Sequence, residues 1–530
     1  MKKLTLSIIS LLFLFNCFPS KKANMLEPEA VKSTKQVKSP TKVFLLDASV
    51  LLFPNGFLLD DGIVVGRGQR IWINRSDNRI RTRRIPLDSI AAMTYYELEH
   101  TAGEQFGSFL LGLFGPPMTF LGLYCLACPK CCFGSCPTVY AYDGKKYQFE
   151  AELFSYSISK YFQDSDLDRL AVQTPKDGKL RIRVSNEALE THYINQFSLL
   201  TVNHPSGTRI FPSPEGGFIS TRQLSSPMSV INSMGENVSR FVDNYDSLWY
   251  RSDSIRVKNL TVNAHRDWLD AKIDTPMYSD RIKLVFRLRN TLLSTILFYD
   301  VVLASQGIDA ITWAEKMNAN PLYSAQFNTL YKIYAGVKIK VLRNGEWELR
   351  SSVGDVGPIA WKDIAVEIPL KKSDVNQRGE LNIRLEFFTD NFMIDYIAYE
   401  VGGSAEDSLH ISESLPSQIL DDSSIKREDV FSLIQNNDSK YLVTNPGESF
   451  YFDYDLRSAP CMQTTLFVRS KGFYIEWMRG NWLASQQSDY AFNPWNVDQA
   501  ISKLKESWLG NRDLLEKEFF KNRIPLREGL

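Results

Sequence analysis

The stretch VKIKVLRNGEWELR, residues 337–350, decides the class of fold that we expect for this chain. Val337, Ile339 and Val341 alternate with lysines, which is the period of a strand with one buried face. Asn344-Gly345 is the residue pair that two-residue hairpin turns prefer, and Trp347 to Arg350 then return as a second strand. This stretch therefore predicts antiparallel β-structure.

The same pattern recurs on both sides of it. Ile282, Leu284, Phe286 and Leu288 alternate with more polar residues, and apolar side chains at 381, 383, 385 and 387 do likewise. Helix formers fill 309–334, a helix is expected near Glu236–Leu248, and apolar residues recur at helical spacing from Asn496 to Gly510. We predict a mainly β chain with helical insertions (α+β), ending in helices.

Composition excludes some classes of function. The chain has 530 residues, of which 44% are hydrophobic and 23% charged, as in ordinary globular proteins. Its 61 basic residues balance 61 acidic ones, so no overall charge draws it to nucleic acid, and we expect no nucleic-acid partner. The 65 aromatic residues (32 Phe, 23 Tyr, 10 Trp) suit β-rich cores better than they indicate sugar binding.

The N-terminus carries an export signal. Lys2 and Lys3 precede an apolar run from Leu4 to Phe15 that is too short to span a bilayer comfortably. The run ends in Leu14-Phe15-Asn16-Cys17, with Asn where Gly, Ala or Ser is usual, and this box resembles those of spirochaete-type bacterial lipoproteins. The resemblance implies a lipoprotein signal peptide at residues 1–17 with Cys17 as the lipidated residue, on the periplasmic or outer-membrane face of the envelope. An ordinary signal peptide or an uncleaved anchor is the alternative.

Two segments follow the signal. Residues 18–42 are rich in Lys, Ser and Pro without periodicity, which predicts a flexible tether. Residues 43–100 contain short apolar runs separated by turn residues, which predicts a small β meander or barrel.

Residues 106–128 carry no charge, FGSFLLGLFGPPMTFLGLYCLAC. They are long enough to span a bilayer, but Pro116-Pro117 at the centre breaks a helix into two short pieces. A kinked helical hairpin is expected. It contacts the membrane, contacts another protein or lies buried under the next domain, and the sequence leaves these three open.

Five cysteines close this region, which we treat as one segment, 101–136: Cys125, Cys128, Cys131, Cys132 and Cys136. Their spacing comes within one residue of a ferredoxin-type run and contains the pairs that zinc sites use. In an exported protein, disulfides or unpaired structural thiols are expected, so no cofactor is predicted. A zinc or iron–sulfur site is the alternative.

No catalytic residue is predicted. Glu187, Glu190 and His192 lie close together in the sequence and can bring a carboxylate and an imidazole together, although a polar connection between strands explains them better. Glu476 lies among aromatic residues, where its pKa would rise, but has no identifiable partner. Asp164, Asp166 and Asp168 begin like a calcium loop, but Arg169 occupies the glycine position of that motif.

The remainder divides into three expected domains: a β-rich domain at 137–291, a sandwich with inserted helices at 292–402 and a mixed α/β region at 403–530. Residues 337–400, which end in Phe392-Met393-Ile394-Asp395-Tyr396-Ile397, are similar to jelly-roll carbohydrate-binding modules. About seventy residues from SCPTVYAYDG onward resemble a recurrent segment of exported bacterial proteins. The first resemblance implies a β-sandwich, and the second implies no activity.

These patterns together predict an exported, lipid-anchored protein of the cell envelope with a binding or structural role. Its expected partners are the membrane, through Cys17 and the 106–128 segment, and an envelope protein or a glycan. A metal or redox protein built on Cys125–Cys136 and a carbohydrate-active enzyme are the alternatives, with an enzyme the less favoured.

Overall fold

The computed structural model describes residues 20–26, 36–38, 41–45, 50–53, 56–71, 79–99, 136–188, 190–246, 248–275, 279–309, 313, 317, 320–402, 409–444, 448–456, 462–476, 490–510 and 512–514. The chain forms two compact units. The first is Met1–Ala127 with Leu303–Ala310 and Met478–Ala491. The second is Cys128–Val302 with Ile311–Trp477 and Phe492–Leu530.

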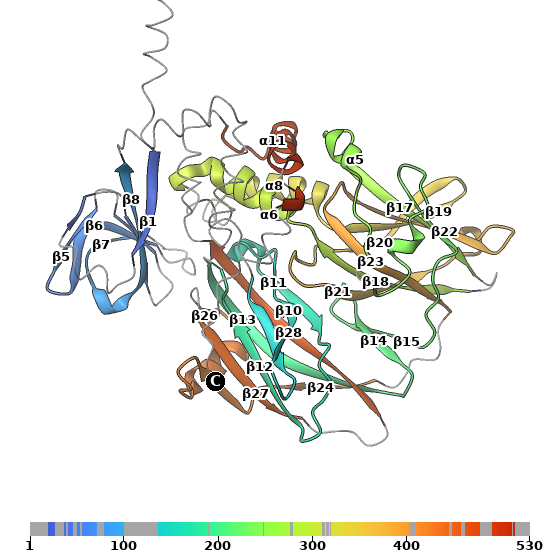
Figure 1. The fold of residues 1–530 in the computed structure, drawn as a ribbon, viewed down its shortest axis with the longest axis horizontal. Coiled ribbons are helices and arrows are strands. Elements are labelled where there is room, and N and C mark those ends of the chain that lie inside the picture. Colours follow the sequence, from blue (N-terminus) through green and yellow to red (C-terminus); the bar gives the residue numbers. More distant parts are fainter. Residues whose placement is uncertain are drawn as a thin grey trace, which may run out of the picture. The chain divides into compact units, whose positions relative to one another are not determined.

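The first unit contains an eight-stranded antiparallel sheet in the order β1-β8-β3-β4-β6-β5-β2, with β7 paired to β6 (Figure 1). Val43, Leu51, Val64 and Met93 are fully buried in its core with Phe53. Its strands are β1 (Ser20–Leu26), β2 (Gln36–Val37), β3 (Thr41–Leu45), β4 (Val50–Phe53), β5 (Phe57–Asp60), β6 (Ile63–Ile71), β7 (Arg79–Pro86) and β8 (Ile90–Glu99).

The expected tether, residues 18–42, is wrong in part, because β1, β2 and the start of β3 lie in it. Strand β1 pairs with β8 over seven residues, from Ser20 opposite Glu99 to Leu26 opposite Met93. A sheet edge offers unpaired backbone groups that a neighbouring segment can satisfy whatever its side chains are. The polar composition that predicted a tether therefore does not reveal this strand.

The second unit contains two β-sandwiches. In the first, Phe197 of one sheet lies 4.7 Å from Phe452 of the other, between ring centroids. Its sheets have the orders β10-β9-β12-β27-β25 and β11-β28-β13-β24, with β26 paired to β13 (Figure 1). The strands are β9 (Thr138–Tyr142), β10 (Tyr147–Glu152), β11 (Asp164–Arg169), β12 (Lys179–Ser185), β13 (Glu190–His204), β24 (His410–Ser414), β25 (Gln418–Asp421), β26 (Leu442–Thr444), β27 (Ser449–Asp455) and β28 (Gln463–Glu476).

The second sandwich contains the alternating stretch 337–350, and Val337, Ile339 and Val341 are buried in its core. Its sheets have the orders β16-β17-β22-β19-β20 and β21-β18-β23. The strands are β16 (Ser229–Asn232), β17 (Arg266–Asp274), β18 (Arg281–Asn290), β19 (Val337–Arg343), β20 (Glu346–Val353), β21 (Lys362–Pro369), β22 (Glu380–Phe388) and β23 (Phe392–Val401). The hairpin β14 (Arg209–Pro212) and β15 (Phe218–Thr221) packs Phe211 on Val285 and Ala365, the outer face of the smaller sheet. The predicted mainly β class is confirmed.

The two sandwiches are interleaved along the chain, which corrects the expected boundaries at 291–292 and 402–403. Strand β12 pairs with β27 and β13 with β28, so the first sandwich joins residues 138–204 to residues 410–476. Strand β17 pairs with β22 and β18 with β23, which places both in the second sandwich. The second sandwich is thus inserted between the two halves of the first.

Helices complete the second unit: α5 (Ser254–Lys258), α6 (Leu293–Ile296), α8 (Pro321–Tyr334), α9 (Glu428–Ile434) and α11 (Val497–Leu509). The predicted helix from Asn496 to Gly510 is confirmed, because the Asn496 side chain caps α11 and Gly510 follows its last residue. The helix predicted near Glu236–Leu248 is wrong. Among the described residues of that range, the helical structure is a three-residue 3-10 turn, Ser239–Phe241.

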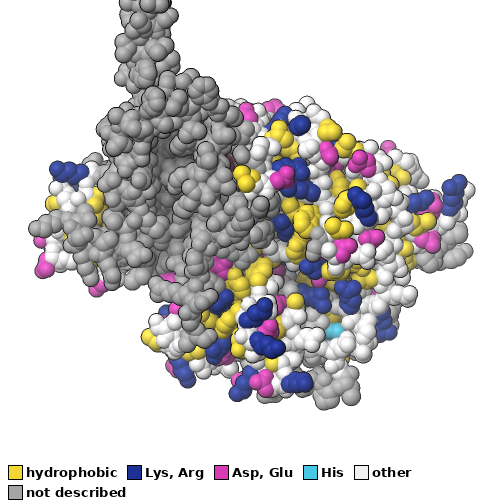
Figure 2. Space-filling view, in the orientation of Figure 1, with side chains coloured by type: hydrophobic (Ala, Val, Ile, Leu, Met, Phe, Trp, Pro, Cys, Tyr) yellow, Lys and Arg dark blue, Asp and Glu magenta, His cyan; other side chains and the backbone are white. Residues whose placement is uncertain are grey.

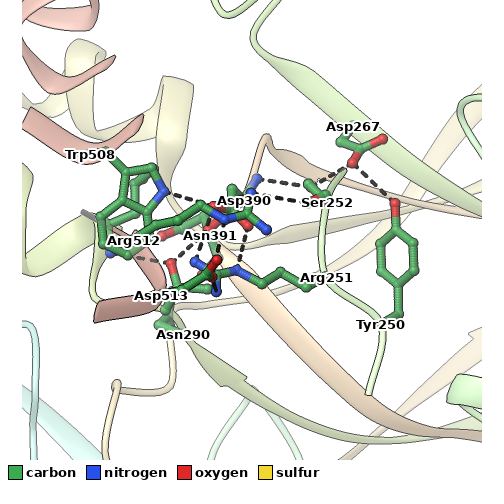
Figure 3. A network of polar contacts seen from close by, with 12 residues as sticks. Tyr250, Arg251, Ser252, Asp267, Asn290, Asp390, Asn391, Trp508, Arg512 and Asp513 are labelled. Carbon is green, nitrogen blue, oxygen red and sulfur yellow. Dashed lines mark hydrogen bonds and ion pairs between the residues drawn. The ribbon is translucent and has the colours of Figure 1, made fainter. Parts of the chain in front are cut away.

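The C-terminal helix is fastened to the second sandwich at Asp390, a fully buried carboxylate. Figure 3 shows the guanidinium groups of Arg251 and Arg512 and the indole of Trp508 gathered around it. Arg251 Nε lies 2.8 Å from Oδ1, and Trp508 Nε1 donates to Oδ2 at 2.7 Å. This network accounts for the carboxylate structurally, so we do not treat it as a functional site.

Several expected features lie outside the described residues: Cys17, the 106–128 hairpin, Cys125, Cys128, Cys131 and Cys132. None of the helices that the structure describes is both long enough and apolar enough to cross a membrane.

Candidate functional site

The candidate site lies at the seam of the two sandwiches, where β11 of the first meets β21 of the second. Both are edge strands of their sheets. Arg169 Nη1 donates to Asp363 Oδ2 at 3.1 Å across this seam. The buried carboxylate of Glu152 crosses it too, accepting from the backbone N–H groups of Ile359 at 2.7 Å and Ala360 at 3.0 Å.

A buried lysine bridges two aspartates at the seam. Asp166 and Asp168 are two residues apart on β11 and so face the same side of the strand. Lys362 Nζ forms ion pairs with both, at 3.0 Å to Asp168 Oδ1. The Asp-x-Asp-x-Asp run that resembled a calcium loop therefore holds a lysine ammonium.

Burial changes the proton affinities of this trio. Desolvation, with repulsion from Asp166, raises the pKa of Asp168 from its ordinary 3.8 to about 8, against the attraction of Lys362. Desolvation lowers the pKa of Lys362, but the attraction of the two carboxylates outweighs it and the pKa is raised overall. Two acids share one base, so one carboxyl is poised to keep its proton near neutral pH.

A pocket of about 250 Å³ opens at this seam. Its charged lining residues are Glu150, Asp168, Arg169, Arg287, Lys362 and Asp363. Its apolar lining residues are Phe149, Leu167, Leu170, Ala171, Ile359, Ala360 and Trp361. We call this the seam pocket. It combines two aromatic side chains, Phe149 and Trp361, with acids and bases in equal number. The guanidinium carbons of Arg287 and Arg289 lie 5.9 and 5.4 Å from the centre of the Trp361 ring.

Aromatic residues continue outward from Trp361. Trp249 lies 5.9 Å from Trp361 between ring centroids, and Tyr245 lies 4.4 Å from Tyr396. Tyr245 and Trp249 are each 39% exposed. The guanidinium carbon of Arg287 lies 4.9 Å from the centre of the Tyr245 ring, which links this aromatic edge to the pocket lining.

Three polar atoms of the pocket lining have no hydrogen-bond partner within the part of the chain that is described. They are Asp168 Oδ2, Arg169 Nε and Arg287 Nε, all buried. Arg287 Nε does lie 3.1 Å from Asp395 Oδ2, an ion pair without hydrogen-bond geometry. Buried polar atoms are normally hydrogen-bonded, so these three leave hydrogen-bonding capacity unused in residues that line the pocket.

The structure brings together three of the polar residues that the sequence singled out, at another place. Glu190 lies opposite Glu476 in the pairing of β13 with β28. The Tyr299 hydroxyl hydrogen-bonds Glu476 and lies 3.3 Å from Glu190, and His192 Nε2 lies 3.1 Å from Glu190 Oε2. Glu190 and His192 are fully buried and Glu476 is 6% exposed, so the cluster connects strands and is closed to substrate.

Glu187 is separate from that cluster. Its Oε1 accepts from Tyr140 and, at 3.1 Å, from the hydroxyl of Thr138, both on β9. The expectation that it shares a site with His192 is therefore not met, because the turn after β12 directs it to the neighbouring strand.

Cys136 is the one member of the cysteine cluster that the structure describes. Its thiol is buried, lies 3.5 Å from the carbonyl oxygen of Ser155 and has no disulfide partner among the described residues. Burial, with repulsion from Glu152 and Glu190, raises its pKa well above the ordinary value, so the protonated thiol is favoured. Within the described ranges, no three or more His, Cys, Asp and Glu side chains are grouped so as to hold a metal ion. The zinc and iron–sulfur alternative stays a prediction.

Sequence reasoning missed the seam pocket. Its residues come from β10, β11, β18 and β21 and from the segments that follow β11 and precede β21. These elements are separated by up to about two hundred positions in the sequence. The Asp-x-Asp-x-Asp run was a usable signal, because acids at alternate positions of a strand face one side and need a partner when buried. Nothing in the sequence identifies that partner as Lys362.

Comparisons with known proteins supply no argument about the site. No protein-family model matches the chain, and no curated protein matches it. Among solved structures, a β-porphyranase of glycoside hydrolase family 86 from the human gut bacterium Bacteroides plebeius matches 46% of this chain and 37% of its own, with 11% identity and a TM-score of 0.15. The structure of infectious bursal disease virus, Gx strain, matches 95% of this chain and 89% of its own, with 9% identity and a TM-score of 0.14. Neither similarity supports an argument about fold or function.

Proposed function

We propose that this chain is an exported, lipid-anchored protein of the cell envelope that binds a ligand in the seam pocket. The Lys2-Lys3 start, the apolar run and Cys17 support the anchor. The seam pocket supports the binding role, because it places unpartnered polar atoms beside a large aromatic ring. Small-molecule sites commonly combine such apolar walls with a few placed polar groups.

The observation that carries the binding role is the unsatisfied pair Asp168 Oδ2 and Arg169 Nε. Leaving a buried polar atom unpaired costs about 1–3 kcal/mol, so a fold retains such atoms at a cost unless something pairs with them. The acceptor and the donor belong to consecutive residues of β11, whose side chains face opposite sides of the strand, and both residues line the seam pocket. A ligand with both a donor and an acceptor satisfies both.

The anchor is tested by growing a bacterial host with labelled palmitate and comparing wild type with Cys17→Ala. We expect label on the wild type and none on the variant. Cys136→Ala is the control, because the buried Cys136 thiol is not a lipidation candidate, and it should keep the label. Label retained by Cys17→Ala would overturn the lipid anchor.

The binding role is tested by native mass spectrometry of the full-length protein after exposure to the low-molecular-weight fraction of a bacterial envelope extract. We expect a retained mass on wild type that Trp361→Ala and Arg169→Gln each reduce at least tenfold. Trp495→Ala, an exposed tryptophan away from the pocket lining, should retain it. No retained mass on wild type, or equal retention by both pocket variants, contradicts the proposal.

A hydrolase acting in the same pocket is a second candidate, favoured by the pKa of Asp168. A carboxyl that keeps its proton near neutral pH, in a pocket also lined by Asp363, a carboxylate that is paired with arginines, is a combination that acid–base catalysis uses. Release of reducing ends from glycan substrates, abolished in Asp168→Asn, would support it. If glycans bind but no reducing ends are released at any pH at which the protein is folded, the hydrolase candidate is excluded and the binding role stands.

A further inference from the structure

The charged residues that line the seam pocket indicate that its ligand is neutral. Each of its three cations already has an acidic partner: Arg169 with Asp363 at 3.1 Å, Lys362 with Asp168 at 3.0 Å, and Arg287 with Asp395 at 3.1 Å. An anion entering the pocket would have to compete with these carboxylates. Figure 2 shows the same balance on a larger scale, since basic and acidic side chains are interspersed over the described part of the visible face.

The unpartnered atoms favour hydroxyl groups. Arg169 Nε and Arg287 Nε are donors without a hydrogen bond, and Asp168 Oδ2 is an acceptor without one while it is ionised. A hydroxyl group both donates and accepts, so several hydroxyls on one molecule can satisfy both kinds of atom. A carboxylate or phosphate ligand only accepts hydrogen bonds, so it cannot donate one to Asp168 Oδ2 when that carboxyl is ionised.

The apolar wall favours a flat, partly apolar ligand. Trp361 lines the pocket, and Trp249 extends the aromatic surface outward from it. An aromatic ring offers a large rigid apolar surface at low entropic cost. A sugar ring has C–H groups on its faces and hydroxyls around its edge, which suits a ring wall with polar groups beside it.

The size limits the ligand further. The pocket measures about 250 Å³, whereas pockets for drug-sized ligands are roughly 300–1,000 Å³. It therefore holds one small ring system. The exposed Tyr245 and Trp249 leave room for a longer molecule to continue beyond it.

We propose that the seam pocket binds one unit of a neutral saccharide, stacked on Trp361 and hydrogen-bonded through its hydroxyls to Asp168, Arg169 and Arg287. This inference rests on the proposed binding role and names its ligand class. The saccharide would contact both sandwiches. Asp168 and Arg169 lie on β11 of the first, whereas Arg287 lies on β18 of the second and Trp361 directly precedes β21.

The test is a binding titration of the full-length protein, in a detergent without a sugar headgroup, against neutral oligosaccharides and their uronate or sulfated counterparts. We expect at least one neutral series to bind, with anionic counterparts weaker by at least tenfold. Trp361→Ala and Arg169→Gln should each weaken binding at least tenfold.

Two controls keep the test specific. Trp495→Ala removes an exposed tryptophan outside the pocket, and Arg427→Gln removes an ion-paired arginine that also lies over an aromatic ring, Phe450. Both should bind as wild type does. Circular dichroism of each variant shows whether it is folded, and Arg169→Lys serves as the milder variant if Arg169→Gln does not fold.

The outcomes separate the two proposals. If the pocket variants abolish retention of an envelope ligand but no neutral saccharide binds, the binding role stands and the saccharide assignment is wrong. Preference for the anionic series likewise overturns the assignment. If the wild type retains nothing from the extract and binds no saccharide, both proposals fail.

Discussion

Among single residues, the buried carboxyl groups of Asp390 and Asp168 are those that we expect to affect the free energy of unfolding most. Asp390 has a left-handed backbone (φ 62°), which aspartate and asparagine tolerate better than most residues. Its side chain is fully buried and accepts from Arg251 and Trp508, with Arg512 Nη1 at 3.3 Å. The residue thus joins a strained turn to the docking of α11.

Asp390→Asn isolates the charge, because asparagine keeps the shape and tolerates the same backbone. It removes the buried one of the two carboxylates that Arg251 and Arg512 share, and the other, Asp513, is exposed. Breaking a buried ion pair in this way costs about 3–5 kcal/mol. We expect the free energy of unfolding in urea to fall by that order, whereas Asp429→Asn, which removes an exposed ion pair with Arg427, should change it by about 1 kcal/mol or less. Equal effects of the two substitutions would contradict this reading.

Asp168 should make stability depend on pH. Its folded-state pKa is raised from 3.8 to about 8, so between those values the folded chain holds a proton that the unfolded chain releases. Its stabilising contribution is therefore complete below 3.8 and is lost as the pH rises through about 8. In urea titrations across this window, Asp168→Asn should decline less steeply with pH than wild type. Asp429→Asn is the control, because its pKa is lowered by Arg427 and it should keep the wild-type slope in this window. Identical slopes for wild type and Asp168→Asn would refute the assignment.

At the scale of elements, the long pair β13 and β28 organises the first sandwich. Their register shifts between Ile194 and Gln196, opposite Gly472 and Lys471. A Cβ on Gly472 would lie 2.5 Å from the carbonyl oxygen of Tyr193 and 2.7 Å from the Phe154 ring. The glycine therefore permits the close approach of two strands at the irregularity.

Gly472→Ala should destabilise the protein by about 1–3 kcal/mol, because backbone and a packed ring must move to admit a methyl group. Thermal unfolding measures the effect. Gly354→Ala is the matched control, since nothing lies within 4 Å of a Cβ there and its φ is not in the left-handed region. If both alanines prove equally tolerated, the crowding at Gly472 is not a constraint.

One predicted element, the helix near Glu236–Leu248, does not form. Turns form there instead, because asparagine side chains accept hydrogen bonds from the backbone N–H groups. Asn232 Oδ1 accepts from the N–H groups of Met234 and Glu236, and Asn237 Oδ1 accepts from that of Ser239. Such local bonds compete with helix formation.

At the scale of the whole molecule, the insertion of one sandwich into the other is the main departure from expectation. The segment 137–291 reads as one domain, yet β12 also pairs with β27, and β13 pairs only with strands from residue 410 onward. Likewise β17 also pairs with β22, and β18 pairs with β21 and β23, which lie between 362 and 401. A fragment 137–291 lacks β27, β28, β22 and β23. A fragment 205–402 contains every strand of the second sandwich.

We therefore expect fragment 205–402 to unfold cooperatively on heating and fragment 137–291 to show no cooperative transition, by circular dichroism and dispersion of NMR amide signals. The larger fragment should be less stable than this sandwich is in the full chain, because it lacks Trp508 and Arg512 at Asp390. Cooperative unfolding of 137–291 would contradict the interleaved topology.

The mainly β class, the strands at 282–288, 337–350 and 381–387 and the C-terminal helix can be predicted from the amino-acid sequence, because alternation, hairpin turns and caps are local signals. The sequence also indicates that Glu190, His192, Glu476 and the three aspartates of β11 need polar partners. Three features follow from long-range contacts alone: β1 joins a sheet, one sandwich is inserted in the other, and Lys362 pairs with Asp166 and Asp168 beside Trp361. Strand pairing between distant segments depends on backbone hydrogen bonds and shared cores, and neither identifies its partner in the local pattern of residues.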